Sequence, residues 1–334
     1  MNKKQKNILT LWLLLGMLTV AIIVLVGGIT RLTNSGLSMV EWNLISGSIP
    51  PMNENEWEIA FDKYKQFPEY KKINQDMLLE EFKIIYFWEY LHRILGRILG
   101  IIFIIPFLFF IIKRWLTTKQ IKKLLLLLIL GGGQAFLGWF MVKSGLIDVP
   151  AVSHYRLASH LIVAFCIISY IYWLILDTNN TILKSNKNIN KWSKFLILIL
   201  LIQIVSGAFV AGLKAGYLVD PENNLLEKLF GYNSLSQINF LNNGYDLQAF
   251  HRLFAWTVFC IAIIIYSKTR RTNLSKIGTI ILIITLIQMS LGIATLLLQV
   301  PINTAVAHQF TAMILLLSIV HITYVSSETS QSDA

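Results

Sequence analysis

The stretch Trp88–Gly96 reads WEYLHRILG, and a second stretch, Leu247–Ala255, reads LQAFHRLFA. Each places a His-Arg pair near the start of an apolar run that is long enough to cross a membrane. A histidine inside a hydrocarbon span is costly and marks a functional site by default. The histidine recurs in a similar sequence, which predicts a duplicated site. Three residues before the histidine, the first copy has Glu89 and the second has Gln248.

The composition excludes an ordinary soluble domain. Of 334 residues, 55% are hydrophobic and 14% are charged, and the mean hydropathy is +0.61. About 20 apolar residues span a bilayer as a helix. Eight such runs predict a polytopic, all-α membrane protein; they cover roughly residues 8–29, 83–112, 124–143, 154–176, 194–214, 246–267, 277–299 and 303–325.

The net charge of +11 follows the membrane topology rather than a nucleic-acid surface. With an even number of spans, both termini and three connecting segments share one side of the membrane. These segments hold 16 Lys and Arg against 3 Asp and Glu, whereas the rest of the chain holds 13 against 15. Basic residues mark the cytoplasmic side, so we expect cytoplasmic termini, two long outer loops (30–81 and 215–245) and no nucleic-acid partner.

The start of the chain and its cysteines indicate where the protein is located. Seven residues precede the first run, too few for an amphipathic transit peptide. We therefore expect a multi-pass protein of the bacterial inner (plasma) membrane. Cys166 and Cys260 both fall inside apolar runs, where we expect core positions and no disulfide.

Four features recur in the same order in both halves, which predicts two tandem four-helix bundles, 1–176 and 177–334. They are a pair of glycines nine residues apart, the His-Arg element, a Gln-x-x-Leu-Gly motif, and a Val-Pro pair followed by a histidine. The matched positions are Gly27 and Gly36 with Gly207 and Gly216, Gln134–Gly138 with Gln288–Gly292, and Val149–Pro150 with Val300–Pro301.

Two histidines in each half are expected near the outer side of the membrane: His92, His160, His251 and His308. They could be metal ligands, a proton relay, or structural residues that bond neighbouring helices. Each is followed four residues later by Gly or Ala, at Gly96, Ala164, Ala255 and Ala312. A small residue one turn along the same face leaves room for a flat group, as bis-histidine haem between helices requires.

Other polar residues near the outer side have two interpretations. Four arginines could bind haem propionates or extend to lipid headgroups: Arg31, Arg93, Arg156 and Arg252. His154 and His321 have no matching partners in the repeat, so we expect interfacial or packing roles for them.

Glu89 lies three residues before His92, on the same helical face. A carboxylate in an apolar span tends to be neutral or paired, so one interpretation is a salt bridge to Arg93 or Arg97. The second copy keeps the shape with Gln248 and loses the charge. We therefore expect the first half to carry out chemistry and the second half to pass electrons.

Several segments closely resemble the haem A synthase family, especially the branch shared by alphaproteobacteria and mitochondria. The resemblance covers nearly the whole chain. Its most specific parts are Gly27–Ser38 (GGITRLTNSGLS), Glu41-Trp42 through Pro50-Pro51, Phe61–Lys65 (FDKYK), and Phe82-Lys83 running on to Trp88-Glu89 and His92-Arg93. Unlike some bacterial members, this chain has no cysteine pair in its outer loops.

The resemblance implies an oxidoreductase that converts the C8 methyl of haem O to the formyl of haem A by successive hydroxylations with oxygen from water. It also implies that His92 and His160 belong to the substrate site, that His251 and His308 ligate a haem b cofactor, and that Glu89 is the essential glutamate. The product would serve terminal cytochrome oxidase. Implied partners are haem O synthase (the farnesyltransferase) and a membrane electron-transfer partner, and a homo-oligomer is left open.

Two other functions compete with this one. A di-haem b-type electron-transfer cytochrome would hold two permanent haems and convert neither. A transporter would also explain a repeat, but it predicts polar groups at the membrane midplane, whereas the histidines and arginines here lie toward one face.

Overall fold

The computed structural model describes residues 1–41, 46–146, 151–181, 183–218 and 240–327. Val149–Pro150, Trp42 and most of the loop 215–245 lie outside these ranges. Within them the chain is helical and contains no strand. The eight long helices are α1 (Lys3–Leu32), α4 (Leu79–Ile112), α5 (Thr118–Gly145), α6 (His154–Thr178), α7 (Lys187–Gly212), α9 (Gly244–Thr269), α10 (Ser275–Leu297) and α11 (Ile302–Val325).

These helices have 23 to 34 residues, enough to cross a bilayer. Each of the eight predicted runs corresponds to one of them, so the prediction of an all-α membrane protein with eight spans is confirmed. Polar caps set several starts: Thr117 accepts from the Gln120 amide before α5, and Asn186 from the Ile189 amide before α7. The described residues also form short elements: α2 (Glu54–Lys65), α3 (Pro68–Lys72), and the 3-10 turns η1 (Ser46–Ser48), η2 (Ala215–Leu218) and η3 (Phe240–Asn242).

By packing, the chain divides into two compact units. The first unit is Leu18–His160, and the second is Met1–Met17 with Leu161–Ala334. Helices α1 and α6 each contribute to both. The predicted boundary at 176/177 concerns sequence duplication rather than packing, so it stays a prediction.

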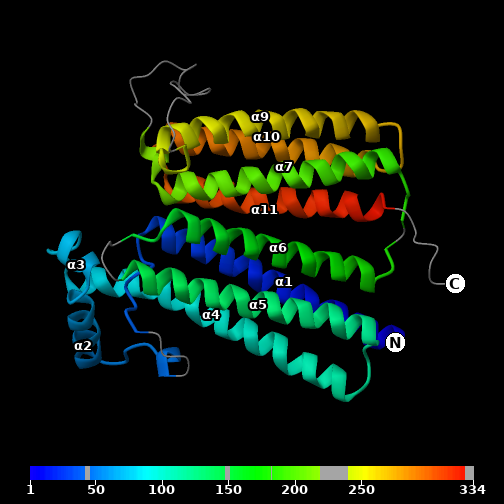
Figure 1. Cartoon of the computed structure of the whole chain (residues 1–334). Helices are drawn as coiled ribbons and strands as arrows, with labels where there is room; N and C mark the ends of the chain where they lie inside the picture. The colour runs from blue at the N-terminus through cyan, green and yellow to red at the C-terminus, as the bar shows by residue number, and fades with distance from the viewer. Residues whose placement is uncertain (42–45, 147–150, 182, 219–239, 328–334) are drawn as a thin grey trace. The chain divides into compact units, whose positions relative to one another are not determined.

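The second unit contains a ring of four packed helices (Figure 1). Helix α7 packs against α9 and α11, and α10 packs against the same two helices. Fully buried aliphatic side chains fill its core, among them Leu196, Leu247, Ile265, Ile281 and Leu315. Histidines on α9 and α11 are therefore held within a closed bundle.

In the first unit, α2 and α3 form a cap over the start of α4. Phe61 and Tyr64 of α2 pack on Phe82 of α4, with ring centroids 5.0 and 5.1 Å apart. Ile85 completes this buried cluster. The cap fixes the first turns of α4, directly before Glu89 and His92.

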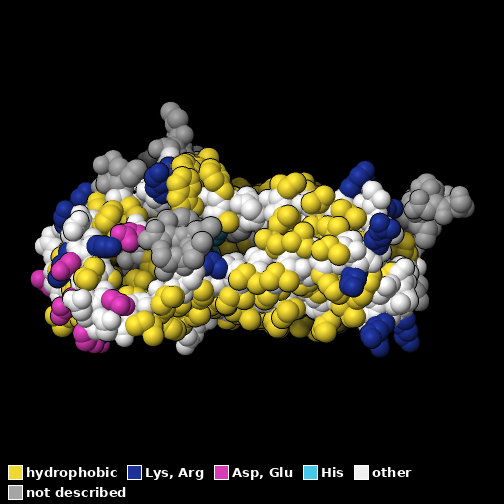
Figure 2. All heavy atoms as spheres, turned by 90° about the horizontal axis from the view of Figure 1, so that it is seen from below, with side chains coloured by type: hydrophobic (Ala, Val, Ile, Leu, Met, Phe, Trp, Pro, Cys, Tyr) yellow, Lys and Arg dark blue, Asp and Glu magenta, His cyan; other side chains and the backbone are white. Residues whose placement is uncertain are grey.

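The outer faces of the long helices are apolar, as expected for lipid contact. Ile105, Ile129 and Leu198 are each more than half exposed. Figure 2 shows hydrophobic side chains along the helices, while Asp and Glu gather at the end of the first unit that carries α2 and α3. Cys166 and Cys260 are also exposed and unbonded, so their predicted core positions are wrong.

Candidate functional site

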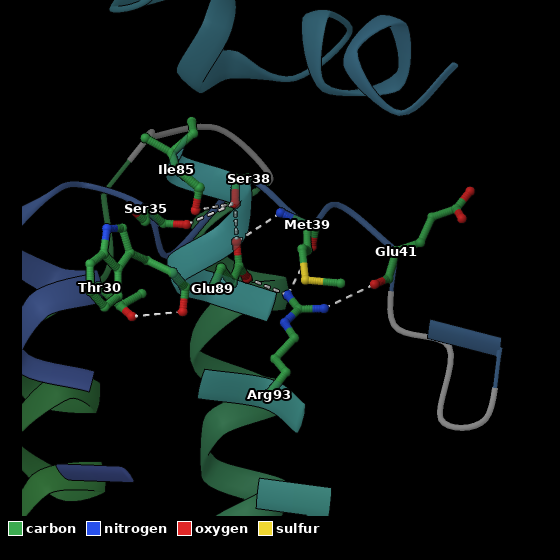
Figure 3. Close-up of polar contacts among 9 residues, drawn as sticks. Thr30, Ser35, Ser38, Met39, Glu41, Ile85, Glu89 and Arg93 are labelled. Carbon is green, nitrogen blue, oxygen red and sulfur yellow. Dashed lines mark hydrogen bonds and ion pairs between the residues drawn. The ribbon is translucent and has the colours of Figure 1, made fainter. Parts of the chain in front are cut away.

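Glu89 is a buried and fully paired carboxylate near the start of α4. One oxygen, Oε2, accepts from the Ser38 hydroxyl and from the Met39 amide, both at 2.7 Å. The other, Oε1, accepts from Arg93 Nη2 at 2.5 Å. The residue is 3% exposed. The carboxylate therefore fastens the segment after α1 onto α4 (Figure 3).

Arg93 is buried on the same face, one turn after Glu89. Besides the carboxylate, its guanidinium donates to the Met39 carbonyl at 2.8 Å and to the Glu41 carbonyl at 3.0 Å. The predicted ion pair between Glu89 and Arg93 is therefore present. A propionate at Arg93 would have to replace one of these bonds.

The second unit repeats this arrangement without the carboxylate. Arg252 Nη2 donates to Gln248 Oε1 at 2.5 Å, and Gln248 Nε2 donates to the Ala215 carbonyl at 3.0 Å. In both units the side chain three residues before the histidine bonds the arginine four residues after itself. The two environments therefore differ by one negative charge in otherwise similar surroundings.

Each of the four predicted histidines packs against a glycine on the preceding long helix, with its Cε1 atom nearest. A Cβ added at these glycines would lie 2.9 to 3.1 Å from the Cε1 atom of the imidazole, closer than side chains tolerate. The pairs are Gly27 with His92, Gly138 with His160, Gly207 with His251, and Gly292 with His308. All four histidine residues are partly exposed. The glycines therefore let the backbone approach each ring.

The hydrogen bonds of His251 fix its tautomer. Its Nδ1 lies 2.8 Å from Ser206 Oγ. The single hydroxyl proton of Ser206 goes to the Gln203 carbonyl at 2.8 Å, so Ser206 accepts from the imidazole. The Nε2 atom of His251 is then unprotonated, as a metal ligand requires. It faces the Gln203 amide nitrogen at 3.4 Å, a contact that a bound metal would replace.

His308 is held in the same tautomer. Its Nδ1 donates to the backbone carbonyl of Gln288 at 3.1 Å. The rings of His251 and His308 have centroids 6.4 Å apart. A metal about 2 Å from one nitrogen of each ring would separate the centroids by roughly 6 Å. Both the distance and the tautomers thus suit an iron atom between the two rings.

A metal site with three or more protein ligands is not supported by the described residues. No group of three or more His, Cys, Asp or Glu side chains with metal-binding geometry occurs in the part of the chain that the structure describes. A cluster of this kind is what a bare zinc site would need. Two axial histidines with a flat macrocycle between them fit the residues present.

His92 and His160 both belong to the first unit, on α4 and α6. In contrast to the second unit, the Nδ1 atoms of both rings lack a hydrogen-bond partner. The carbonyl of Ile23 lies toward His92 without forming a bond of normal geometry. Gln134 Nε2 donates to the His160 carbonyl at 2.9 Å, which ties the helix rather than the ring.

The remaining predicted residues lie as follows. Arg156 stacks over Phe140, with 4.6 Å between its Cζ and the ring centroid. Arg31 and Arg252 are partly exposed. His154 opens α6, and its ring lies against Tyr155. His321 Nδ1 bonds the Tyr172 hydroxyl at 2.8 Å, in agreement with a packing role.

Two features of the site are not evident from counting motifs alone. In the sequence the glycines are only matched positions of the repeat, and nothing there indicates that they contact histidines. A Gln four residues before the glycine occurs on α5, α7 and α10, at Gln134, Gln203 and Gln288, whereas α1 has Ile23. This Gln-x-x-x-Gly spacing is the signal that could have indicated which helices face a histidine.

Comparison with known proteins gives consistent results. The family described as cytochrome oxidase assembly protein, COX15-CtaA, matches residues 10–320. A haem A synthase of Flavobacterium johnsoniae is 42% identical, with 95% of this chain and 96% of that protein covered. Haem A synthases of Nitrosospira multiformis and Rickettsia bellii are also 42% identical, each over 93% of this chain and over 91% and 96% of their own lengths.

Proposed function

Because the chain belongs to the COX15-CtaA family of cytochrome oxidase assembly proteins, we propose that it is a haem A synthase that oxidises the C8 methyl of haem O to a formyl group. The observation that carries this proposal is the pairing of four histidines with four glycines, two pairs in each unit. It supplies two bis-histidine haem sites, one for a substrate and one for a cofactor.

The cofactor site is formed by His251 and His308. Their Nδ1 atoms are bonded, and their ring spacing suits one iron atom. Their Nε2 atoms face the amides of Gln203 and Gln288 at 3.4 and 3.3 Å, and iron would replace these contacts. Haem b bound there would supply one-electron redox chemistry. The protein's part is to hold both rings in one tautomer within a closed bundle.

The substrate site is formed by His92 and His160, with Glu89 one turn away on the same face as His92. Two hydroxylations with water and the loss of one water convert the methyl to a formyl, which releases four protons and four electrons. The reaction therefore needs a negative group that stabilises the positive charge developing on the substrate, and it needs a route by which electrons leave. Glu89 supplies the first, and the haem b site supplies the second.

The role of Glu89 follows from its contacts. Ser38, Met39 and Arg93 all donate to its carboxylate, so a proton acceptor would have to give up one of these bonds. Fixed donors hold the carboxylate in place. Electrostatic stabilisation of an electron-deficient substrate therefore fits the geometry better than proton transfer does.

The duplication is part of the proposal. Asn34 and Lys214 both have positive φ, 52° and 53°, two residues after the ends of α1 and α7. The two helices also end 180 residues apart, as Gly27 and Gly207 are. These matches support one ancestral four-helix unit for 1–176 and 177–334.

The location and partners follow from the charge pattern and the reaction. We expect a bacterial inner membrane protein with cytoplasmic termini, haem O delivered by the farnesylating haem O synthase, and electrons passed to a membrane partner. Self-association stays open. Labelling of single cysteines placed at Lys3 and at Glu58, in a variant without Cys166 and Cys260, would test the sidedness.

Pigment extraction from the purified protein tests the activity. Haem O or haem A beside haem b supports the synthase, whereas two haem b per chain would support the di-haem carrier instead. Glu89→Gln should keep the haem b spectrum and abolish haem A formation. Ser38→Ala is its control, because it removes one hydrogen bond to the carboxylate and leaves the charge. Unchanged haem A output from Glu89→Gln would remove Glu89 from the mechanism.

A further inference from the structure

The two units differ in how they hold the histidine of the His-Arg element. We infer that Ser206 and Gln203 position His251 so that its haem is retained, and that Ile23 and Val26 at the matching places make His92 an exchangeable ligand. The inference rests on the proposed function, since it assigns retention to the cofactor site and release to the substrate site.

Ser206 acts on the imidazole directly. It accepts from His251 Nδ1 at 2.8 Å and passes its own proton to the Gln203 carbonyl at 2.8 Å. Ser206 is buried, at 3% exposure, so water does not compete for these bonds. This directed chain holds the ring in one orientation and tautomer and increases its basicity toward a metal.

Gln203 holds the backbone that carries the ring. Its Nε2 donates to the His251 carbonyl at 2.9 Å and lies 3.4 Å from His251 Nε2. An amide N–H facing Nε2 is a second sign that this nitrogen is unprotonated. Together with Gly207, these residues put three contacts from α7 on one histidine.

The first unit keeps the glycine and loses the two polar residues. Four residues before the glycine, α7 has Gln203 and α1 has Ile23. One residue before it, α7 has Ser206 and α1 has Val26. Neither side chain can bond an imidazole, and His92 Nδ1 has no hydrogen-bond partner. The ring packs against Gly27 but is not oriented by any side chain of α1.

This difference matches what the two sites must do. A cofactor stays bound through many turnovers, whereas a substrate has to leave after its methyl has been oxidised. Removing the group that bonds a ligating histidine typically weakens metal binding by about 10- to 100-fold. The first unit would therefore bind haem through two rings whose Nδ1 atoms have no hydrogen-bond partner, and His92 in addition lacks the α1 counterparts of Gln203 and Ser206.

The experiment compares Ser206→Val with Ser206→Thr in the full-length protein. The two side chains have the same shape, but only threonine keeps the hydroxyl. We would measure the rate of haem b transfer to excess apomyoglobin and the electron paramagnetic resonance g-values of the bound haem. Ser193→Ala is the matched control, because Ser193 is also buried on α7 and bonds a carbonyl three residues back, at 2.9 Å.

We expect transfer to be about 10- to 100-fold faster for Ser206→Val, with altered g-values, and near wild-type for Ser206→Thr and Ser193→Ala. The reverse graft, Ile23→Gln with Val26→Ser, should slow the release of haem O, and Val24→Ser serves as its control. Equal transfer rates for the Val and Thr variants would overturn the inference and leave the proposed function standing. Retention of haem b by His251→Ala would overturn the cofactor site itself.

Discussion

Replacing Gly207 by alanine tests the central geometric feature of the cofactor site. The new Cβ would lie 2.9 Å from His251 Cε1 and 3.5 Å from its Nδ1. Carbon atoms pack best at about 3.5 to 4.0 Å, so the imidazole of His251 would have to move away from α7. It cannot do so freely, because Nδ1 is bonded to Ser206 at 2.8 Å.

The size of the effect follows from overpacking a tight contact, which typically costs about 1 to 3 kcal/mol. If that strain is relieved when the ring leaves its ligating position, haem b binds roughly 5- to 150-fold more weakly. Alanine is a better helix former than glycine by up to about 1 kcal/mol. The substitution therefore does not weaken α7 itself, and it should instead lower the affinity for haem b.

The assay is haem b per chain after purification in detergent, together with the rate of haem loss on dilution. Gly132→Ala is the control, because a Cβ there meets nothing within 4 Å. Gly292→Ala should behave like Gly207→Ala, since its Cβ would lie 2.9 Å from His308 Cε1. Full haem content and an unchanged loss rate in Gly207→Ala would refute the reasoning.

Three further predictions concern other parts of the chain. Glu89→Gln should lower the free energy of unfolding of the first unit by about 3 to 5 kcal/mol, because Arg93 stays buried without its counter-charge. The expected readout is faster proteolysis before α2. An unchanged cleavage rate would contradict this prediction. Tyr64→Phe should loosen the cap by roughly 1 to 3 kcal/mol, because it leaves Glu69 without the Tyr64 hydroxyl, which is 3.1 Å away. Burial and the nearby Glu69 raise the pKa of Tyr64, so the stability that this phenol contributes is complete below its ordinary pKa of about 10 and falls as the pH rises further; thermal melts of the Phe variant should lack this loss. His321→Ala should keep full haem content, and haem loss there would make His321 more than a packing partner of Tyr172.

The spans and the histidines could be predicted because their signals are local. Hydropathy over about 20 residues identifies a membrane helix without knowledge of its neighbours. The pairing of Glu89 with Arg93 also follows from i,i+4 spacing. Ser38 and Met39 could not be predicted as its other partners, because they come from about fifty residues earlier in the chain.

The errors and omissions share one physical cause, the rotation of each helix about its axis. A membrane helix is apolar on all sides, so its sequence does not distinguish core from lipid-facing positions. The sequence therefore predicts core positions for Cys166 and Cys260, although both residues are exposed. For the same reason the sequence showed Gly207 and Ser206 without showing that both face His251.

The ion pair of Glu89 and Arg93 also bears on how the protein enters the membrane. An isolated charge near the centre of a span opposes insertion by about 2.5 to 3.5 kcal/mol. Both charges lie on α4, one turn apart, so the helix carries its own counter-ion as it leaves the ribosome. The two opposite charges can therefore enter the membrane as a neutral pair, before Ser38 and Met39 bond the carboxylate.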